Sequence, residues 1–308
     1  MKRSYLFLAI ILIILSIILN SCSTQEVALN KTGIIKEVKA DYPVAMKKPS
    51  ETKIFDYWIL DNYSWMKDKE RKNKKILDYI NKEKKYANTK LRKLSTLKAK
   101  LYDEIVGRVD QADVSVPVKL DDYLHYSRDI EGKQYPIYCR KLDKIDAVEE
   151  ILLDLNELSK QHQFLELGTY KLSPDHRFLA YTLDTSGKEH YTLYVKYLQY
   201  GKIMPEVIER VDDVEWSNDS RNIYYSTTNE ENERTDKVFR HTIGTKVNED
   251  KLLYKEDDPS FYVWVNKTKD KKYLLIGTAN KITSEMRYLS TDTPLGSFTM
   301  VFPRKKGT

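Results

Sequence analysis

The stretch KLSPDHRFLAYTLDTSGKEHYTLYVKYLQYGK, residues 171–202, decides the fold class. It contains two turn sequences, SPD at 173–175 and SG at 186–187. The segments 178–183 and 191–198 are rich in aromatic and aliphatic residues, and we expect their side chains to alternate between two faces. Such segments bounded by turn residues are typical of β-strands. We therefore predict three short strands joined by turns in this stretch.

The same strand-and-turn pattern occurs about four times between residues 111 and 308. Asp175, Asp219 and Asp270 occupy equivalent turns, spaced 44 and 51 residues apart. Equivalent positions on the third strand of each unit are assigned to four aromatic residues: Tyr138, Tyr194, Phe239 and Tyr288. A period in the mid-forties with four strands per unit is typical of β-propeller blades, whereas a β-sandwich would not explain the long repeat. We predict a mainly β fold, a partial β-propeller of about four blades preceded by an α-helical arm.

The three turn aspartates have a structural explanation. An Asp side chain can accept a hydrogen bond from the backbone two residues further on and so fix a hairpin turn. We therefore interpret Asp175, Asp219 and Asp270 as blade-turn residues and not as ligand contacts.

The first 22 residues have the layout of a bacterial export signal. Lys2 and Arg3 precede an apolar run from Tyr5 to Ile18, which is short for a membrane-spanning helix of about 20 residues. The sequence LNSC at 19–22 resembles a lipobox, in which the cysteine is lipidated and becomes the first mature residue. We predict Cys22 as the lipid attachment site, residues 23–42 as a tether, and a location in the cell envelope, facing the periplasm or exterior. The alternative is a signal peptide with an incidental cysteine.

Residues 43–110 are predicted to form a basic helical arm. Between Lys67 and Lys100 there are 14 Lys or Arg against 4 Asp or Glu, so that the rest of the chain carries a net charge of −4. Asp68 is a candidate cap, and a break is expected at Asn88 or Thr89. Apolar residues recur at helical spacing at Ile76, Leu77, Ile80, Leu91, Leu94, Leu97, Leu101 and Ile105. We expect this stripe to pack against another surface while the lysines face water. Binding to anionic lipid is a second possibility, and nucleic acid is excluded as a partner of an exported protein.

No catalytic, cofactor-binding or metal-binding residue is predicted. Cys139 lies in a strand pattern and is interpreted as a packing residue, and with Cys22 lipidated no intramolecular disulfide is expected. Two acidic groups, Glu256-Asp257-Asp258 and Asp212-Asp213-Glu215, lack the six to eight converging oxygens that a hard cation needs. The five histidines are interpreted as surface or packing residues, because no activatable nucleophile accompanies them: His125, His162, His176, His190 and His241.

Several segments together resemble the amino-terminal half of oligopeptidase B, in the prolyl oligopeptidase group of serine peptidases. The resemblance runs in order from about Tyr42 to the last residue. It is carried by DNYSWMKD (61–68), KEKKYA (82–87), LYDEIVGRVDQADVSVPV (101–118), YLHYSRDIEGKQYPIYCRK (123–141), LLDLNEL (152–158), LSPDHRFLAYTLDTSGKEHYTLYVKYL (172–198) and TSEMRYL (283–289). No single one of these motifs would be sufficient alone.

This resemblance implies a two-domain enzyme that cleaves short peptides after Lys or Arg. A seven-bladed propeller would cap an α/β-hydrolase domain that holds the Ser, Asp and His of the triad. A helical extension, which matches Lys67 to Arg108 here, would pack along that catalytic domain. The family is usually cytoplasmic, so export would be a departure.

The sequence departs from the family in a second way. A nucleophile elbow needs G-x-S-x-G, and none of the 308 residues forms it; DTSGK (184–188) and LGSFT (295–299) both fail. The sequence stops at Thr308, after about four blades. We therefore expect the propeller, substrate-gating portion of a peptidase that lacks its catalytic domain and is inactive alone. It would meet peptide substrates only when a catalytic domain or a complementing second chain completes it. The alternative is a non-enzymatic, membrane-anchored propeller that acts as a binding module.

Overall fold

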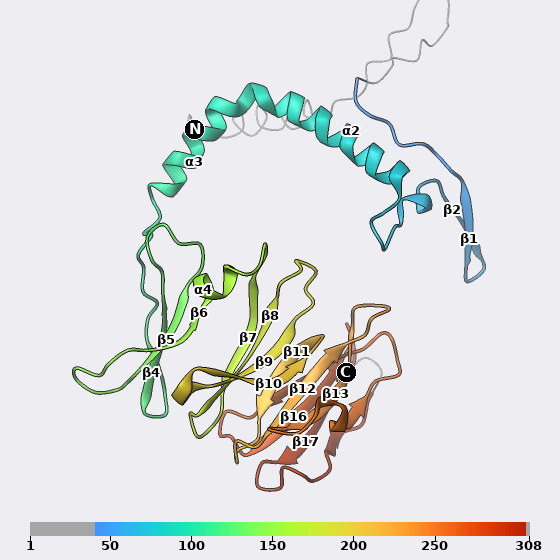
Figure 1. Cartoon of the computed structure of the whole chain (residues 1–308). Helices are drawn as coiled ribbons and strands as arrows, with labels where there is room; N and C mark the ends of the chain where they lie inside the picture. The colour runs from blue at the N-terminus through green and yellow to red at the C-terminus, as the bar shows by residue number, and fades with distance from the viewer. Residues whose placement is uncertain (1–40, 306–308) are drawn as a thin grey trace, which may run out of the picture. The chain divides into compact units, whose positions relative to one another are not determined.

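The computed structural model describes residues 41–305, which form two compact units that divide after Arg108 (Figure 1). The predicted export signal, Cys22 and nearly all of the predicted tether lie outside the described residues. Within residues 41–305, no helix combines the length and the apolar character needed to cross a membrane.

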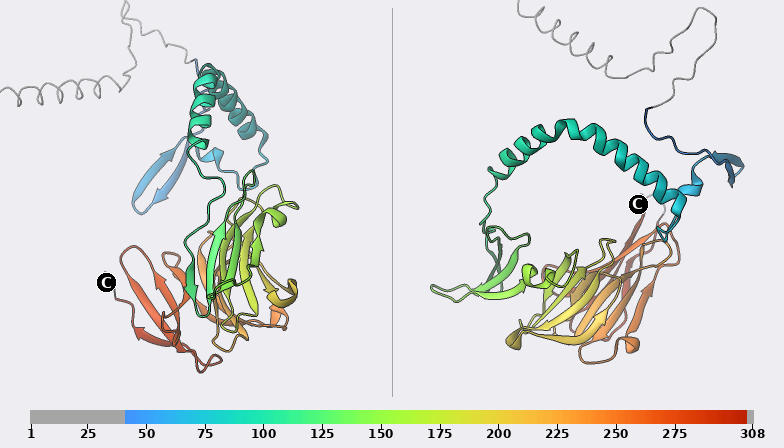
Figure 2. Two further views of the ribbon diagram at one scale, coloured as in Figure 1. Left: turned by 90° about the vertical axis from the view of Figure 1, so that its left-hand side faces the viewer. Right: turned by 45° about the horizontal axis from the view of Figure 1, so that its top comes forward.

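The second unit consists of four antiparallel sheets of four strands each, which follow one another in chain order (Figures 1 and 2). Blade 1 contains β3 (Val118–Leu120), β4 (Tyr123–Arg128), β5 (Ile137–Leu142) and β6 (Glu150–Asp154), followed by the short helix α4 (Leu155–Ser159). Blade 2 contains β7 (Glu166–Leu172), β8 (Phe178–Asp184), β9 (Thr192–Tyr197) and β10 (Lys202–Ile208). Blade 3 contains β11 (Val211–Trp216), β12 (Asn222–Thr228), β13 (Thr235–Thr242) and β14 (Lys251–Lys255). Blade 4 contains β15 (Tyr262–Lys267), β16 (Tyr273–Ala279), β17 (Ser284–Ser290) and β18 (Thr299–Phe302). The predicted mainly β fold with four propeller blades is confirmed.

The turns between the first and second strands of blades 2, 3 and 4 share one hydrogen-bonded motif. In blade 2, Asp175 Oδ1 accepts from the backbone N–H of Arg177 at 3.1 Å, and the Ser173 hydroxyl donates to the same oxygen at 2.6 Å. Asp219 and Asp270 accept in the same way from Arg221 and Lys272 and from the hydroxyls of Ser217 and Thr268. The residue after each aspartate has a φ of about 60°. The prediction that these aspartates fix the blade turns is confirmed.

The second strands of blades 2 and 3 are buried on both faces, which the expected alternation did not anticipate. Six of the seven residues of β8, from Leu179 to Asp184, are buried. In blade 3, Asn222 to Ser226 of β12 are buried as well. Each sheet between two other sheets covers both of its faces, so that a central strand needs small or apolar residues at every position.

The apolar core lies between consecutive blades. One cluster joins blades 1 and 2 around Leu152, Leu179 and Tyr181, and a second joins blades 2 and 3 around Val195 and Trp216. A third joins blades 3 and 4, where Tyr224 and Val238 contact Val263, Val265, Leu274, Ile276 and Leu289. The stability of each blade therefore depends on its neighbours.

The four marker aromatics all lie on third strands, but they are not all equivalent. Tyr194 and Phe239 pair with the fourth residue of the preceding strand and face the preceding blade. Tyr288 pairs with Leu275, the third residue of β16, and Tyr138 contacts Tyr170 of the following blade. A shift of one residue moves a strand side chain to the opposite face, and this explains the difference.

The first unit contains a hairpin as well as helices. β1 (Ser50–Ile54) pairs with β2 (Tyr57–Asp61), and the 3-10 turn η1 (Ser64–Met66) follows. The description of residues 43–110 as helical was therefore wrong for this segment. A turn at Phe55, with a φ of 54°, allows the two strands to pair locally.

The helices of this unit are α2 (Lys74–Leu91) and α3 (Ser95–Val106), joined by the 3-10 turn η2 (Arg92–Leu94). Asn73 caps α2 through its side chain, while Asp68 accepts a hydrogen bond from the backbone N–H of Asn73. The break lies at Arg92–Leu94 and not at Asn88 or Thr89. Of the predicted apolar stripe, Ile76 is buried, and the other seven residues are between 40% and 62% exposed.

Candidate functional site

The predicted chemistry-bearing residues do not assemble into a catalytic centre in the described part of the chain. Glu256 accepts hydrogen bonds from Arg304 and Tyr254, and Asp257 pairs with Lys255 at 2.6 Å. Each of these acids is thus engaged by a neighbouring cation or hydroxyl. Among residues 41–305, no group of three or more His, Cys, Asp or Glu is arranged to hold a metal ion.

Cys139 is buried in β5, and burial raises the pKa of its thiol to about 11. The thiolate is the reactive form of cysteine, so a raised pKa keeps this thiol inert at neutral pH. The interpretation of Cys139 as a packing residue is confirmed.

The five histidines occupy different environments. His241 is fully buried and lies 2.6 Å from Asp250, while His162 is exposed in the loop after α4. His190 lies 3.1 Å from Glu233 at the edge of blade 3. His125 and His176 line a cavity of the second unit, a location that the sequence did not predict.

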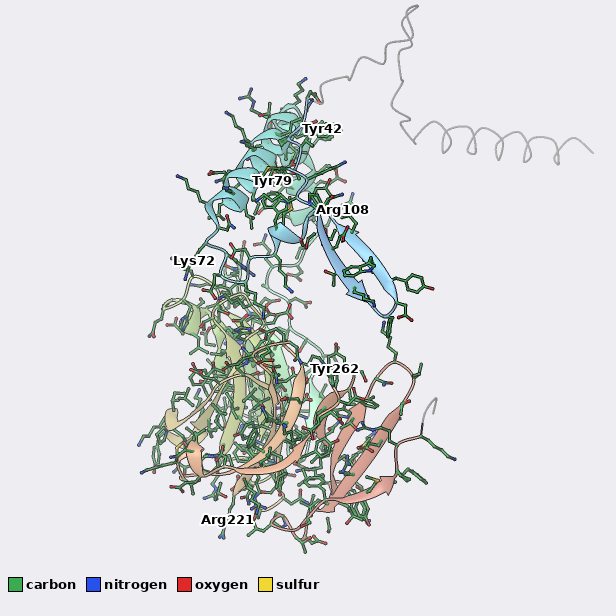
Figure 3. The ribbon with its side chains drawn as sticks, turned by 90° about the vertical axis from the view of Figure 1, so that its right-hand side faces the viewer. Tyr42, Lys72, Tyr79, Arg108, Arg221 and Tyr262 are labelled. Carbon is green, nitrogen blue, oxygen red and sulfur yellow. The ribbon has the colours of Figure 1, made fainter. Side chains whose placement is uncertain are left out.

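This cavity lies along the first strands of the four blades and measures about 710 Å³. We call it the inner-strand trough. Its walls come from β3 and the segment before it, from three residues of β4 and one of β5, from β7 and its turn, from Glu215 of β11, and from β15 and its turn. In Figure 3, Arg221 marks the end of the sheets where these turns lie, opposite Tyr262 at the start of β15.

Two carboxylates in the trough each contact two basic side chains. Glu215 lies 3.3 Å from Lys171 Nζ and 3.7 Å from Lys267 Nζ. Asp121 lies 2.8 Å from Lys271 Nζ and 3.3 Å from His176 Nε2. These contacts connect first strands and turns from all four blades.

The electrostatics follow from these contacts. The hydrogen bond from Lys271 holds the pKa of Asp121 below its ordinary value. Burial lowers the pKa of Lys267, whose side chain is 9% exposed, although Glu215 opposes this shift. Burial and then the nearby Arg140 lower the pKa of His125. Blade 4 supplies most of the positive charge through the sequence KTKDKK at 267–272. That sequence is the one signal from which the basic wall could have been found.

The fold is thus that of a propeller whose four described blades line one trough, mainly through their first strands and the turns that follow them. The family model described as the prolyl oligopeptidase N-terminal β-propeller domain matches residues 42–308. The chain belongs to the prolyl oligopeptidase family and comprises its amino-terminal propeller portion.

Curated relatives and solved structures agree with this assignment. Dipeptidyl aminopeptidase BI of Pseudoxanthomonas mexicana is 35% identical over 262 residues, which are 80% of this chain and 36% of that protein. Protease 2 of Moraxella lacunata is 32% identical over 273 residues, which are 86% of this chain and 39% of that protein. Oligopeptidase B from Leishmania major superposes with a TM-score of 0.81 at 28% identity, over 87% of this chain and 40% of that one. Oligopeptidase B from Trypanosoma brucei, with covalently bound antipain, superposes with a TM-score of 0.78 at 29% identity, over 86% of this chain and 40% of that one. The chain spans about two fifths of the length of these relatives.

Proposed function

We propose that these residues form the substrate-gating propeller portion of an oligopeptidase-B-like serine endopeptidase and do not hydrolyse peptides alone. The observation that carries the proposal is the family match over residues 42–308, in a sequence without G-x-S-x-G. A serine nucleophile needs an activating base and an oxyanion hole at a strand-to-helix turn. No such arrangement occurs among the described strands and helices.

Peptide substrates would be hydrolysed only in a complete enzyme. The four blades would form part of the wall through which short peptides pass, and the hydrolase domain would come from further residues or from a second chain. The similarity to oligopeptidase B supports a preference for cleavage after Lys or Arg.

Hydrolysis of a fluorogenic arginine amide tests this proposal. The purified chain is expected to show no activity above buffer. When it is refolded together with the remaining segment of Protease 2 from Moraxella lacunata, some activity should appear, while neither piece is active separately. Hydrolysis by the purified chain alone that persists after a second purification would contradict the proposal.

We further propose that Cys22 carries the lipid and anchors the chain in the cell envelope. The support is the order of segments in residues 1–22, where two basic residues are followed by an apolar run and then by LNSC. A bacterial host that expresses the full chain should incorporate radioactive palmitate into it and retain it in the membrane fraction. Cys22→Ala should abolish both results, whereas Cys139→Ala should abolish neither. Labelling that persists in Cys22→Ala would refute the anchor.

A further inference from the structure

Positive charge exceeds negative charge on the wall of the inner-strand trough. The acidic residues that line it are Asp121 and Glu215. Five lysines also line it: Lys119, Lys171, Lys267, Lys269 and Lys271. Lys119 pairs with Asp143 at 2.6 Å, outside the lining. Of the other four lysines, three share the two carboxylates, one of which also contacts His176.

Lys269 has no hydrogen-bond or ion-pair partner within residues 41–305. It is exposed and lies in the turn of blade 4, two residues after Lys267 and two before Lys271. Lys171 is 42% exposed on the side chain and shares its one carboxylate with Lys267. These two ammonium groups are accessible and have hydrogen-bonding capacity left, because each ammonium offers three donors.

The trough also has apolar walls. Val116, Val118 and Leu120 line one side, and Tyr170 and Leu172 line another. A volume of about 710 Å³ lies within the usual range of roughly 300–1,000 Å³ for small-ligand sites. Charge of one sign in a concave, partly apolar site concentrates ligands of the opposite sign. A bare inorganic anion would leave the apolar walls unused, whereas a short acidic peptide would contact both kinds of surface.

We propose that the inner-strand trough binds a carboxylate of a short peptide, and that Lys269 and Lys171 make the contact. The carboxylate is an acidic side chain or the carboxyl terminus. Glu215 competes with the ligand for Lys171, so this residue limits the affinity. The site lies entirely within blades 1–4 and does not depend on a hydrolase domain.

Titration calorimetry on the detergent-solubilised full chain, at low salt, tests the site with four probes. They are an acetylated, amidated Ala-Glu-Glu-Ala peptide, acetyl-tetra-alanine with a free carboxyl end, the same tetra-alanine amidated, and inorganic phosphate. We expect one or both carboxylate peptides to bind, and to bind at least tenfold more tightly than the amidated tetra-alanine or phosphate. Which of the two binds identifies the source of the carboxylate.

Variants distinguish binding at the trough from a general attraction of the peptide to the positive charge of this turn. Lys269→Ala and Lys171→Ala should each weaken binding about tenfold, because each removes a charge-assisted hydrogen bond. Lys272→Ala is the matched control: it removes a lysine of the same turn that does not line the trough and is 73% exposed on its side chain. Glu215→Gln should tighten binding several-fold, an effect that misfolding would not produce.

Four results would overturn the proposal. The first is equal affinity for the acidic and the amidated neutral peptides, and the second is no binding of any peptide at millimolar concentration. The third is a loss in Lys272→Ala as large as that in Lys269→Ala. Tighter binding of phosphate than of either carboxylate peptide would likewise contradict it.

Discussion

Asp213 illustrates how a single side chain connects two blades. It lies in β11 and accepts a hydrogen bond from the backbone N–H of Val265 in β15. Burial, and then the neighbouring Asp212, raise the pKa of Asp213 to about 6. Ionising this carboxyl therefore costs more free energy in the folded chain than in the unfolded chain. Asp213 is consequently a pH-sensitive component of the interface between blades 3 and 4.

The raised pKa predicts a fall in stability with rising pH. The stabilisation by protonated Asp213 is fully present below pH 3.8 and is lost as the pH rises through about 6. Asp213→Asn, which keeps the acceptor oxygen, should remove this part of the pH dependence. At pH 7 it should raise the free energy of unfolding by at most about 3 kcal/mol. Urea unfolding at pH 4, 5, 6 and 7 measures this change, and parallel curves for the two proteins would contradict it.

The turn aspartates give a second prediction at this scale. Asp219→Ala removes the acceptor for the Arg221 N–H and the Ser217 hydroxyl. We expect a loss of about 1–2 kcal/mol in the free energy of unfolding. Asp257→Ala, at a side chain that is 83% exposed, is the control and should change stability by less than about 0.5 kcal/mol. Thermal unfolding compares the two variants, and equal effects would show that the turn motif is dispensable.

At the scale of elements, the packing of blade 4 depends on one glycine. Trp264, Gly277 and Met286 are paired neighbours across β15, β16 and β17, on the face away from blade 3. A Cβ atom at Gly277 would lie 2.2 Å from the ring of Trp264. The glycine therefore allows the indole to lie flat across the sheet.

This contact predicts that Gly277→Ala will destabilise the chain by about 1–3 kcal/mol, because the indole has to leave its position. The double-mutant cycle with Trp264→Ala isolates the cause. In the Trp264→Ala background, Gly277→Ala should cost almost nothing, since the clashing ring is gone. Additive effects in chemical denaturation would mean that the glycine serves another purpose.

At the scale of the whole molecule, the face of blade 4 away from blade 3 carries exposed aromatic side chains. Phe302 is 73% exposed, and Tyr273 and Tyr288 are 40% and 37% exposed. Their paired positions place them on the same face as Trp264. Exposed apolar sheet surface of this kind promotes association.

We therefore expect the purified chain to self-associate, and Tyr288→Lys with Phe302→Glu to reduce the associated fraction. Size-exclusion chromatography with light scattering measures the mass. Thr245→Lys with Asn248→Glu, at exposed turn residues, is the control and should leave the mass unchanged. A monomeric parent chain, or a double variant with the mass of the parent, would be inconsistent with this expectation.

Much of the propeller could be predicted because its determinants are local. The Ser or Thr, the Asp and the following turn lie within five residues, so that Ser173 and Asp175 specify their hairpin without help from distant parts of the chain. Tyr138 and Tyr288 were wrongly treated as equivalent to Tyr194 and Phe239, since a one-residue difference in register is not visible in spacing. The hairpin at 50–61 and the helix break at Arg92–Leu94 were missed because a general helical pattern surrounds them.

By itself, the sequence determined the strand content, the four-fold repeat, the turn residues and the family of this protein, because these depend on neighbouring residues and on ordered motifs. Only the tertiary structure decided which side chains line the inner-strand trough. Asp121 and Lys271 are 150 residues apart, yet they form an ion pair at 2.8 Å. Contacts of this kind depend on how successive sheets stack and twist, and no local pattern records that geometry.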